Sequence, residues 1–157
     1  MGIEKILIVD DEVLIRNFLE ETLSRKDYVI HTAPGVKPAK QILKNTQFDL
    51  VITDMKMPDG TGMDLLKAVK AHHPNTLVII ITAFGSVENA VEAMHLGAFN
   101  YLIKPFSPDT IEAMIEKAEE HLSLVEENRY LREEIQSGKM QPKQSLIAES
   151  PAMKKIL

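Results

Sequence analysis

The chain has 157 residues, a formal net charge of −5, an apolar fraction of 45% and no cysteine. Its length suits one domain with an appendage, its negative charge argues against general nucleic-acid binding, and its lack of cysteine excludes disulfides and thiolate metal sites. No apolar run approaches the roughly 20 residues that span a bilayer, and the first strand-like run leaves no room for a signal peptide, so we expect a cytoplasmic protein with no membrane partner.

Short apolar runs alternate with amphipathic stretches along most of the chain. The runs are mostly apolar throughout, as expected for strands that are buried on both faces of a parallel sheet. They predict strands at Lys5–Val9, Val29–Thr32, Leu50–Thr53, Leu77–Ile81 and Ala98–Ile103. The stretches between them repeat apolar residues at helical spacing. Strict alternation of strand and helix predicts an α/β fold, a doubly wound five-stranded parallel sheet with helices on both faces.

The fifth helix is predicted to begin at Pro108, with Ser107 as its N-cap, and to continue beyond the end of a globular domain. Written as heptads, its continuation places Leu124 and Leu131 at d positions and Asn128 at an a position. This pattern favours a weak parallel two-stranded coiled coil, in which a buried Asn sets the register. The alternative is a solvated extension of the last helix.

Five reactive side chains follow four of the predicted strands. They are Asp10 and Asp11, Asp54, Thr82 and Lys104. The carboxyl ends of parallel strands meet at one edge of a sheet, where such folds bind their ligands. Three carboxylates in one pocket repel each other unless a cation shares the space, and a set of hard oxygen ligands suits Mg²⁺. The pattern therefore predicts a site for a divalent ion and a phosphoryl group.

Each of these residues has an expected role in phosphoryl chemistry. Asp54 is the candidate nucleophile, because a carboxylate can attack phosphorus to give an acyl phosphate. Lys104 would offset charge on the phosphoryl oxygens, and the Thr82 hydroxyl would donate a hydrogen bond to one of them. We therefore expect Asp54, Thr82 and Lys104 to be the catalytic residues.

Four segments together resemble the motif set of the two-component response-regulator receiver domain. They are Val9-Asp-Asp-Glu12, Asp54-Met-Lys-Met-Pro-Asp-Gly-Thr-Gly62, Thr82-Ala83 and Lys104-Pro-Phe106. Several motifs in the correct order make a chance match improbable. The resemblance implies a flavodoxin-like fold, with strand order 2-1-3-4-5 and five helices.

The resemblance also implies specific roles for residues. Asp54 would accept phosphate from the phosphohistidine of a sensor histidine kinase. The implied Mg²⁺ ligands are Asp10, Asp11, Asp54 and the carbonyl of Lys56. Thr82 and Tyr101 would be the switch pair, Lys104 would sense the phosphate, and the Lys104–Pro105 peptide bond would be cis.

Three longer segments resemble NtrC-type regulators, which activate sigma-54 transcription through an AAA+ ATPase domain. They are Ile81–Met94, the long fifth helix and Leu146–Met153. We accordingly expect a receiver domain at 1–122, a helical linker or coiled coil at 123–140, and a linker with the truncated start of an AAA+ domain at 141–157. No Walker motif is present, so we expect no ATP hydrolysis. DNA and sigma-54 RNA polymerase would be contacted only through missing domains.

Phosphorylation is expected to act on the association of two chains. A homodimer would form through the fourth helix, the fifth strand, the fifth helix and the linker helix. The apolar residues of this region are Val87, Ala90, Val91, Met94 and Tyr101. They either form a phosphorylation-dependent contact surface or merely pack on the sheet, and the sequence leaves both interpretations open.

Two rival functions use the same residues differently. A phosphohydrolase of the haloacid dehalogenase type also has an Asp nucleophile and Mg²⁺, but it needs a second carboxylate two residues later, where Lys56 stands. A dimerisation module that works without phosphorylation is the other rival, and the complete residue set argues against it. Lys56 and Phe84 cannot readily orient an attacking water, so we expect a fairly long-lived acyl phosphate.

Overall fold

The computed structural model describes residues 3–83 and 87–134, with 87 and 126–134 described as backbone only. Its elements are β1 (Lys5–Val9), α1 (Val13–Leu23), β2 (Val29–Ala33), α2 (Val36–Asn45), β3 (Leu50–Asp54), β4 (Lys56–Met57), β5 (Gly60–Thr61), α3 (Gly62–His72), β6 (Leu77–Thr82), α4 (Val87–His95), β7 (Asn100–Ile103) and α5 (Pro108–Glu134). One compact unit comprises Gly2–Glu120, and a second begins at His121.

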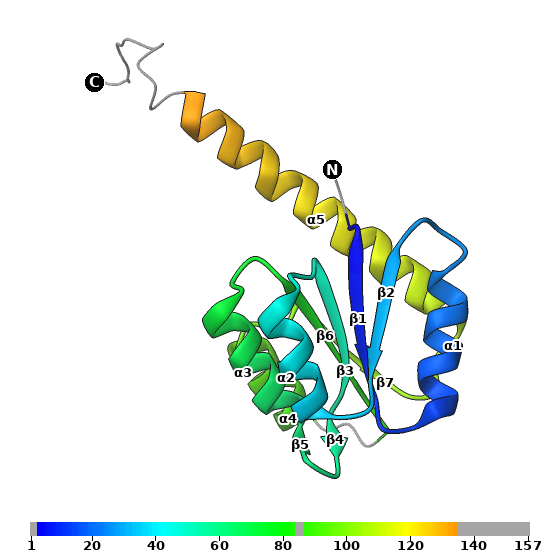
Figure 1. The fold of residues 1–157 in the computed structure, drawn as a ribbon. Helices are drawn as coiled ribbons and strands as arrows, with labels where there is room; N and C mark the ends of the chain where they lie inside the picture. The colour runs from blue at the N-terminus through cyan, green and yellow to red at the C-terminus, as the bar shows by residue number, and fades with distance from the viewer. Residues whose placement is uncertain (1–2, 84–86, 135–157) are drawn as a thin grey trace. The chain divides into compact units, whose positions relative to one another are not determined.

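Five strands form one parallel sheet in the order β2-β1-β3-β6-β7 (Figure 1). This order confirms the predicted arrangement 2-1-3-4-5. Val9 at the end of β1 pairs with Ala33 of β2 and Thr53 of β3. Asp54 at the end of β3 pairs with Ile81 of β6. The strands therefore end nearly level, and the residues that follow them lie along one edge of the sheet.

The central strands β1, β3 and β6 are buried on both faces. Successive side chains of a strand point to opposite faces, and one alternate set of them packs with α2, α3 and α4 in a single apolar cluster. Its members on the central strands are Leu7, Val9, Val51, Val78 and Ile80. Figure 1 shows α1 and α5 on the other side of the sheet, where Ile6, Ile8 and Ile52 are also buried. Burying each such side chain contributes about 1.5–3 kcal/mol, which makes the sheet a rigid support for its edge.

A short antiparallel hairpin, β4–β5, directly follows β3 and was not predicted. The sequence indicated only a break at Pro58, Gly60 and Gly62, because two-residue strands are too short to show any periodicity. The Gly62 N–H donates to the Met55 carbonyl at 2.7 Å. A Cβ at position 62 would collide with the Asp54 carbonyl oxygen. The close return of the chain beside Asp54 thus requires glycine there.

The predicted fifth strand begins two residues too early. Its observed start is Asn100 rather than Ala98, because the Ala98 N–H closes the end of α4 by donating to the Ala93 carbonyl at 3.0 Å. Gly97 adopts a φ of 104° and donates to the Met94 carbonyl at 3.1 Å. These two bonds form the usual glycine-centred helix stop. The strand predicted at Lys5–Val9 is confirmed, and the strands predicted to end at Thr32, Thr53 and Ile81 each end one residue later.

Helix α5 begins at Pro108, as predicted, and the Ser107 hydroxyl caps it by accepting a hydrogen bond from the Thr110 N–H at 3.2 Å. The helix contains 27 residues and continues into the second unit. The predicted coiled coil depends on the side chains of residues 126–134 and on residues beyond 134. Neither these side chains nor these residues are among those that the structure describes. The predicted linker and AAA+ start at 141–157 also lie outside the described residues.

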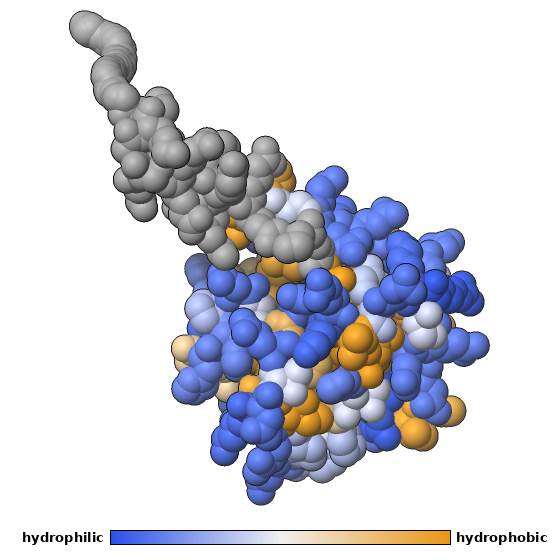
Figure 2. Space-filling view, turned by 45° about the horizontal axis from the view of Figure 1, so that its top comes forward, coloured by the Kyte–Doolittle hydropathy of each residue, from blue (hydrophilic) through white to orange (hydrophobic). Residues whose placement is uncertain are grey.

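The face in Figure 2 is mainly hydrophilic, with apolar residues in separate patches between polar ones. This distribution agrees with the burial of the apolar strands inside the domain. Among the helices in residues 3–83 and 87–134, none is both long and apolar enough to cross a membrane.

Candidate functional site

Three aspartates converge at the carboxyl edge of the sheet. Asp10 and Asp11 follow β1, and Asp54 ends β3. One carboxylate oxygen of each lies within 4.8 Å of the others. Asp10 is only 2% exposed, and its Oδ1 accepts a hydrogen bond from the Glu12 N–H at 2.9 Å. The Asp54 Oδ1 accepts one from the Met55 N–H at 2.8 Å. The structure therefore brings together the three carboxylates that the sequence singled out.

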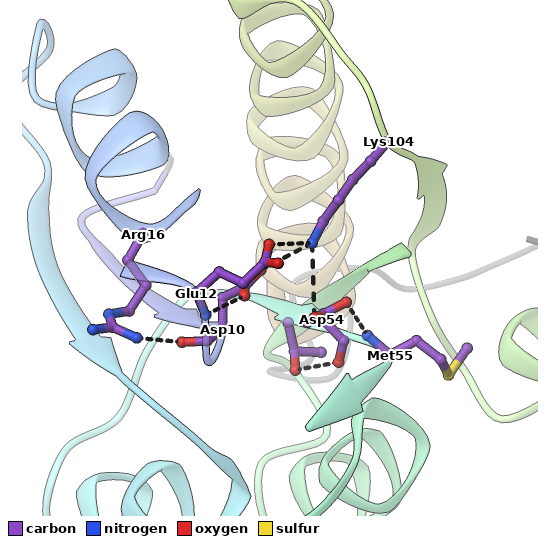
Figure 3. A network of polar contacts seen from close by, with 7 residues as sticks. Asp10, Glu12, Arg16, Asp54, Met55 and Lys104 are labelled. Carbon is purple, nitrogen blue, oxygen red and sulfur yellow. Dashed lines mark hydrogen bonds and ion pairs between the residues drawn. The ribbon is translucent and has the colours of Figure 1, made fainter. Parts of the chain in front are cut away.

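Lys104 reaches into this cluster from the end of β7 (Figure 3). Its Nζ lies 3.4 Å from Asp10 Oδ2 and 3.7 Å from Asp54 Oδ2. The Lys104 N–H donates to the Thr82 carbonyl at 2.7 Å, which fixes the lysine backbone to the end of β6. The Lys104–Pro105 peptide bond is cis. The side chain is 14% exposed, so water screens its charge only partly.

The carboxylates of the site lie close together although their negative charges repel one another. Burial first, and then the charge of Asp10, raises the pKa of Asp54 to about 6. Burial also raises the pKa of Asp10. Burial lowers the pKa of Lys104, but the negative charges of Asp10, Asp54 and Glu12 and the hydrogen bond to Asp10 together outweigh this effect and leave it raised. The site therefore favours an additional positive charge.

The donor set fits a small, hard divalent cation. Two oxygens bound to one Mg²⁺ lie at most about 4.2 Å apart, so a small movement of the three aspartate side chains would allow them to share the ion. Three carboxylates and one ammonium carry a formal charge of −2, which a divalent cation neutralises. Lys56 lies on β4, where it pairs with Thr61 and exposes its side chain.

Replacing Asp54 by asparagine is expected to stabilise the metal-free domain at pH 7. The folded-state pKa of about 6 exceeds the ordinary value of 3.8, so the folded protein binds the proton more tightly than the unfolded chain does. Asp54 therefore costs nothing well below pH 3.8, and its destabilising effect grows between pH 3.8 and about 6 and is complete above that. About two pKa units set an upper limit near 3 kcal/mol, and we expect a gain of about 1–3 kcal/mol at pH 7.

Urea unfolding of both proteins at pH 4 and pH 7 checks this prediction, and Asp27→Asn, in an exposed loop, is the matched control. The gain should be much smaller at pH 4, absent in the control, and removed at pH 7 by saturating Mg²⁺, which relieves the repulsion in wild-type protein. A gain of equal size at both pH values would show that charge repulsion is not its cause.

The two predicted switch residues lie on neighbouring strands. Thr82 ends β6 and is 4% exposed, and Tyr101 lies on β7 opposite Ile80. The Tyr101 ring packs against the apolar cluster, and its hydroxyl is buried without a hydrogen-bond partner among the described residues. Phe84 lies outside the described residues, so the predicted lifetime of the acyl phosphate has no structural test here.

Sequence reasoning gave no role to two charged neighbours of the aspartates. The Glu12 Oε1 lies 3.6 Å from Lys104 Nζ, and the Arg16 Nη1 donates to the Asp10 carbonyl at 2.6 Å (Figure 3). Glu12 stood within a quoted motif, whereas nothing local in the sequence pointed to Arg16. Both side chains help to hold the segment that carries Asp10 and Asp11.

Comparisons with known proteins agree with this geometry. The family model described as "Response regulator receiver domain" matches residues 6–116. The chain is 42% identical over 118 residues to the response regulator protein PilR of Pseudomonas aeruginosa, covering 75% of this chain and 26% of that protein. It is 34% identical to the regulatory protein AtoC of Escherichia coli, covering 99% of this chain and 33% of AtoC. The chain thus spans about a quarter to a third of these relatives.

Solved structures show the same fold. The receiver domain in the solution structure of the beryllofluoride-activated NtrC4 dimer superposes with a TM-score of 0.72 at 36% identity, covering 75% of this chain and 98% of that one. The family match runs from within β1 to within α5, and it includes all the candidate site residues. The chain belongs to the response regulator receiver domain family, whose members are phosphorylation-based switches of two-component signalling.

Proposed function

We propose that Asp54 is the phosphoryl acceptor of this receiver domain. The observation that carries the proposal is the convergence of Asp54, its two neighbouring aspartates and the Lys104 ammonium at one sheet edge. Sensor histidine kinases are the partners that this family serves, and a phosphohistidine is the proposed donor.

The transfer is a displacement at phosphorus. A carboxylate oxygen of ionised Asp54 forms the new P–O bond while the P–N bond to the donor imidazole breaks, and the imidazole leaves with that electron pair and takes up a proton. Lys104 Nζ, 3.7 Å from the Asp54 carboxylate, is placed to neutralise charge on the phosphoryl oxygens. Thr82 at the end of β6 would donate its hydroxyl to one of them. Asp54, Thr82 and Lys104 are thus the proposed catalytic residues.

Asp10, Asp11, Asp54 and the carbonyl of Lys56 would hold Mg²⁺. When bound, the ion supplies electrostatic stabilisation to a phosphoryl group that gains negative charge. Burial raises the pKa of Asp54 and the negative charges of Asp10 and Asp11 raise it further, so a cation that balances them would also favour the ionised form of the acceptor carboxylate.

The proposed output of phosphorylation is a change of the surface formed by α4, β7 and α5. Thr82 and Tyr101 would be the switch pair, shifting a population of two states. Val91 and Met94 of α4 are 49% and 48% exposed, and with Ala90 and His95 they line a shallow apolar depression of about 400 Å³. Their exposure favours a contact surface over simple packing on the sheet.

A homodimer through this surface and the linker helix is part of the proposal. The NtrC4 receiver forms a dimer when activated with beryllofluoride, which supports it. Light scattering of beryllofluoride-loaded wild type against Asp54→Ala is the test. Identical oligomeric states in the two samples would remove this part of the proposal.

The output beyond the receiver domain is proposed by analogy with the longer relatives. These are regulators of about three times this chain's length. By this analogy the whole protein would be an NtrC-type, sigma-54-dependent activator in the cytoplasm, and its other domains would hydrolyse ATP and contact DNA. Residues 1–122 would then be the receiver, 123–140 the linker helix and 141–157 the approach to an AAA+ domain.

The experiment that tests the function separates a switch from a hydrolase. Acetyl phosphate is given to the protein with Mg²⁺, and both the labelled protein and the released phosphate are followed. A switch takes up about one phosphoryl group per chain and then turns over slowly. Sustained turnover of phosphate esters would favour the haloacid dehalogenase interpretation. Dimerisation of the chain to the same extent with and without phosphorylation would favour the phosphorylation-independent dimerisation module.

A further inference from the structure

Helix α2 has no side-chain cap of its own. Its N-cap residue is Gly35, and the first N–H groups of any helix lack partners within the helix. Here the Val36 N–H donates to Asp59 Oδ1 and the Lys37 N–H donates to Asp59 Oδ2, each at 2.9 Å. The cap therefore comes from a residue more than 20 positions later in the chain.

Asp59 lies in the loop of the β4–β5 hairpin, between Met57 and Gly60. This hairpin directly follows Asp54 and includes Lys56. The carboxylate thus ties the segment that carries part of the site to the N-terminus of α2.

A backbone hydrogen bond also connects Asp10 to the segment just before α2. The Ala33 carbonyl, at the end of β2 and just before α2, accepts a hydrogen bond from the Asp10 N–H at 3.1 Å. The ends of β1, β2 and β3 are therefore connected through Ala33, the start of α2 and Asp59. A shift of the hairpin relative to Asp10 has to break the Asp59 bonds or move α2.

The local fit around Asp59 is close. A Cβ on Gly35 would lie 2.7 and 2.8 Å from the two Asp59 carboxylate oxygens. The Lys37 and Val36 amides lower the pKa of Asp59, so both oxygens accept as a charged carboxylate at neutral pH. The pairing of glycine with aspartate is thus suited to a bidentate clamp.

We propose that Asp59 is a positioning residue of the metal site, which holds the hairpin segment after Asp54 in place for Mg²⁺ binding. This inference rests on the proposed function. Asp59 acts through backbone, without contact to the ion, as outer-shell partners of metal ligands do. Its loss should weaken Mg²⁺ binding more than it weakens the fold.

Asp49 offers a matched control at the opposite edge of the sheet. Its Oδ2 accepts hydrogen bonds from the Glu4 and Lys5 N–H groups at 2.8 and 3.1 Å. Asp49→Ala therefore removes the same kind of two-amide clamp, but at the amino end of β1. Any difference in Mg²⁺ affinity between Asp59→Ala and Asp49→Ala therefore reflects the position of the lost clamp relative to the site.

The experiment measures Mg²⁺ affinity by calorimetry in wild type, Asp59→Ala, Asp59→Asn and Asp49→Ala, with urea unfolding of each. We expect Asp59→Ala to bind Mg²⁺ about tenfold more weakly, the lower end of outer-shell effects, and Asp49→Ala to bind it as wild type does. Asp59→Asn keeps one acceptor oxygen and should fall between. Half-maximal labelling by acetyl phosphate should need more Mg²⁺ in Asp59→Ala, with the maximal rate little changed.

Amide hydrogen exchange at Val36 and Lys37 reports whether the clamp has opened. Faster exchange in Asp59→Ala with wild-type Mg²⁺ affinity would overturn the inference, as would an equal loss of affinity in Asp49→Ala. If wild-type protein itself binds no Mg²⁺ and takes no label, the proposed function fails, and the inference fails with it.

Discussion

Lys104→Met is expected to slow phosphoryl transfer to Asp54 by about a hundredfold, because a preorganised charge at a developing oxyanion typically contributes this much. The Lys104 Nζ lies between Asp10 and Asp54, 3.4 and 3.7 Å from their carboxylates. Methionine has similar length but no charge. Mg²⁺ affinity should not fall, since the substitution removes a positive charge that repels the ion. The initial rate of labelling by acetyl phosphate at several Mg²⁺ concentrations is the measurement.

Lys67→Met is the matched control for this prediction. The Lys67 side chain is exposed on α3, and Lys67 has no assigned role in the site. The substitution removes the same formal charge, so labelling should proceed nearly as in wild type. If the two variants are labelled equally fast at saturating Mg²⁺, Lys104 does not stabilise the transferred group.

Gly62→Ala is expected to destabilise the domain by about 2 kcal/mol. Two effects oppose each other at this first residue of α3. Alanine should favour the helix by about 1 kcal/mol, but its Cβ would collide with the Asp54 carbonyl oxygen and approach the Met55 Cα at 3.3 Å. Overpacking of this kind costs about 1–3 kcal/mol, and here the obstacle is backbone, which cannot rotate away. We therefore take the upper end of that range, and the collision outweighs the propensity.

Urea unfolding of Gly62→Ala measures the change in the free energy of unfolding, and its sign shows whether the helix propensity or the collision is the larger effect. Relief of the collision would have to displace the Asp54 backbone, so labelling at Asp54 should also fall. A variant more stable than wild type would mean that the chain does not return so closely beside Asp54. Ala71→Gly, later in the same helix, measures the propensity term alone.

The site was predictable because its residues stand at strand ends. Apolar runs located Asp54 and Lys104 at the ends of strands, and the topology of a parallel sheet brings such ends together wherever they lie in sequence. The chemistry of three carboxylates and one amine then led to Asp54 as the proposed acceptor. The sheet order followed from the family resemblance and was confirmed.

The features that sequence reasoning missed depend on tertiary contacts. Arg16 lies six residues from the carbonyl that it contacts, and Asp59 caps a helix that begins 23 residues earlier. Neither partner can be found from local spacing. The strand that starts at Asn100 was placed too early because the bond from Ala98 to α4 depends on the positive φ of Gly97.

The measurement that tests the central claim most directly is the location of the phosphoryl adduct. Wild-type protein and Asp54→Asn are incubated with acetyl phosphate, with Mg²⁺ or with a chelator, and the acyl phosphate is trapped by borohydride reduction before peptide mapping. We predict a single Mg²⁺-dependent adduct at Asp54 that is absent from the chelated sample and from Asp54→Asn. An adduct on another residue, or equal labelling of Asp54→Asn, would contradict the account.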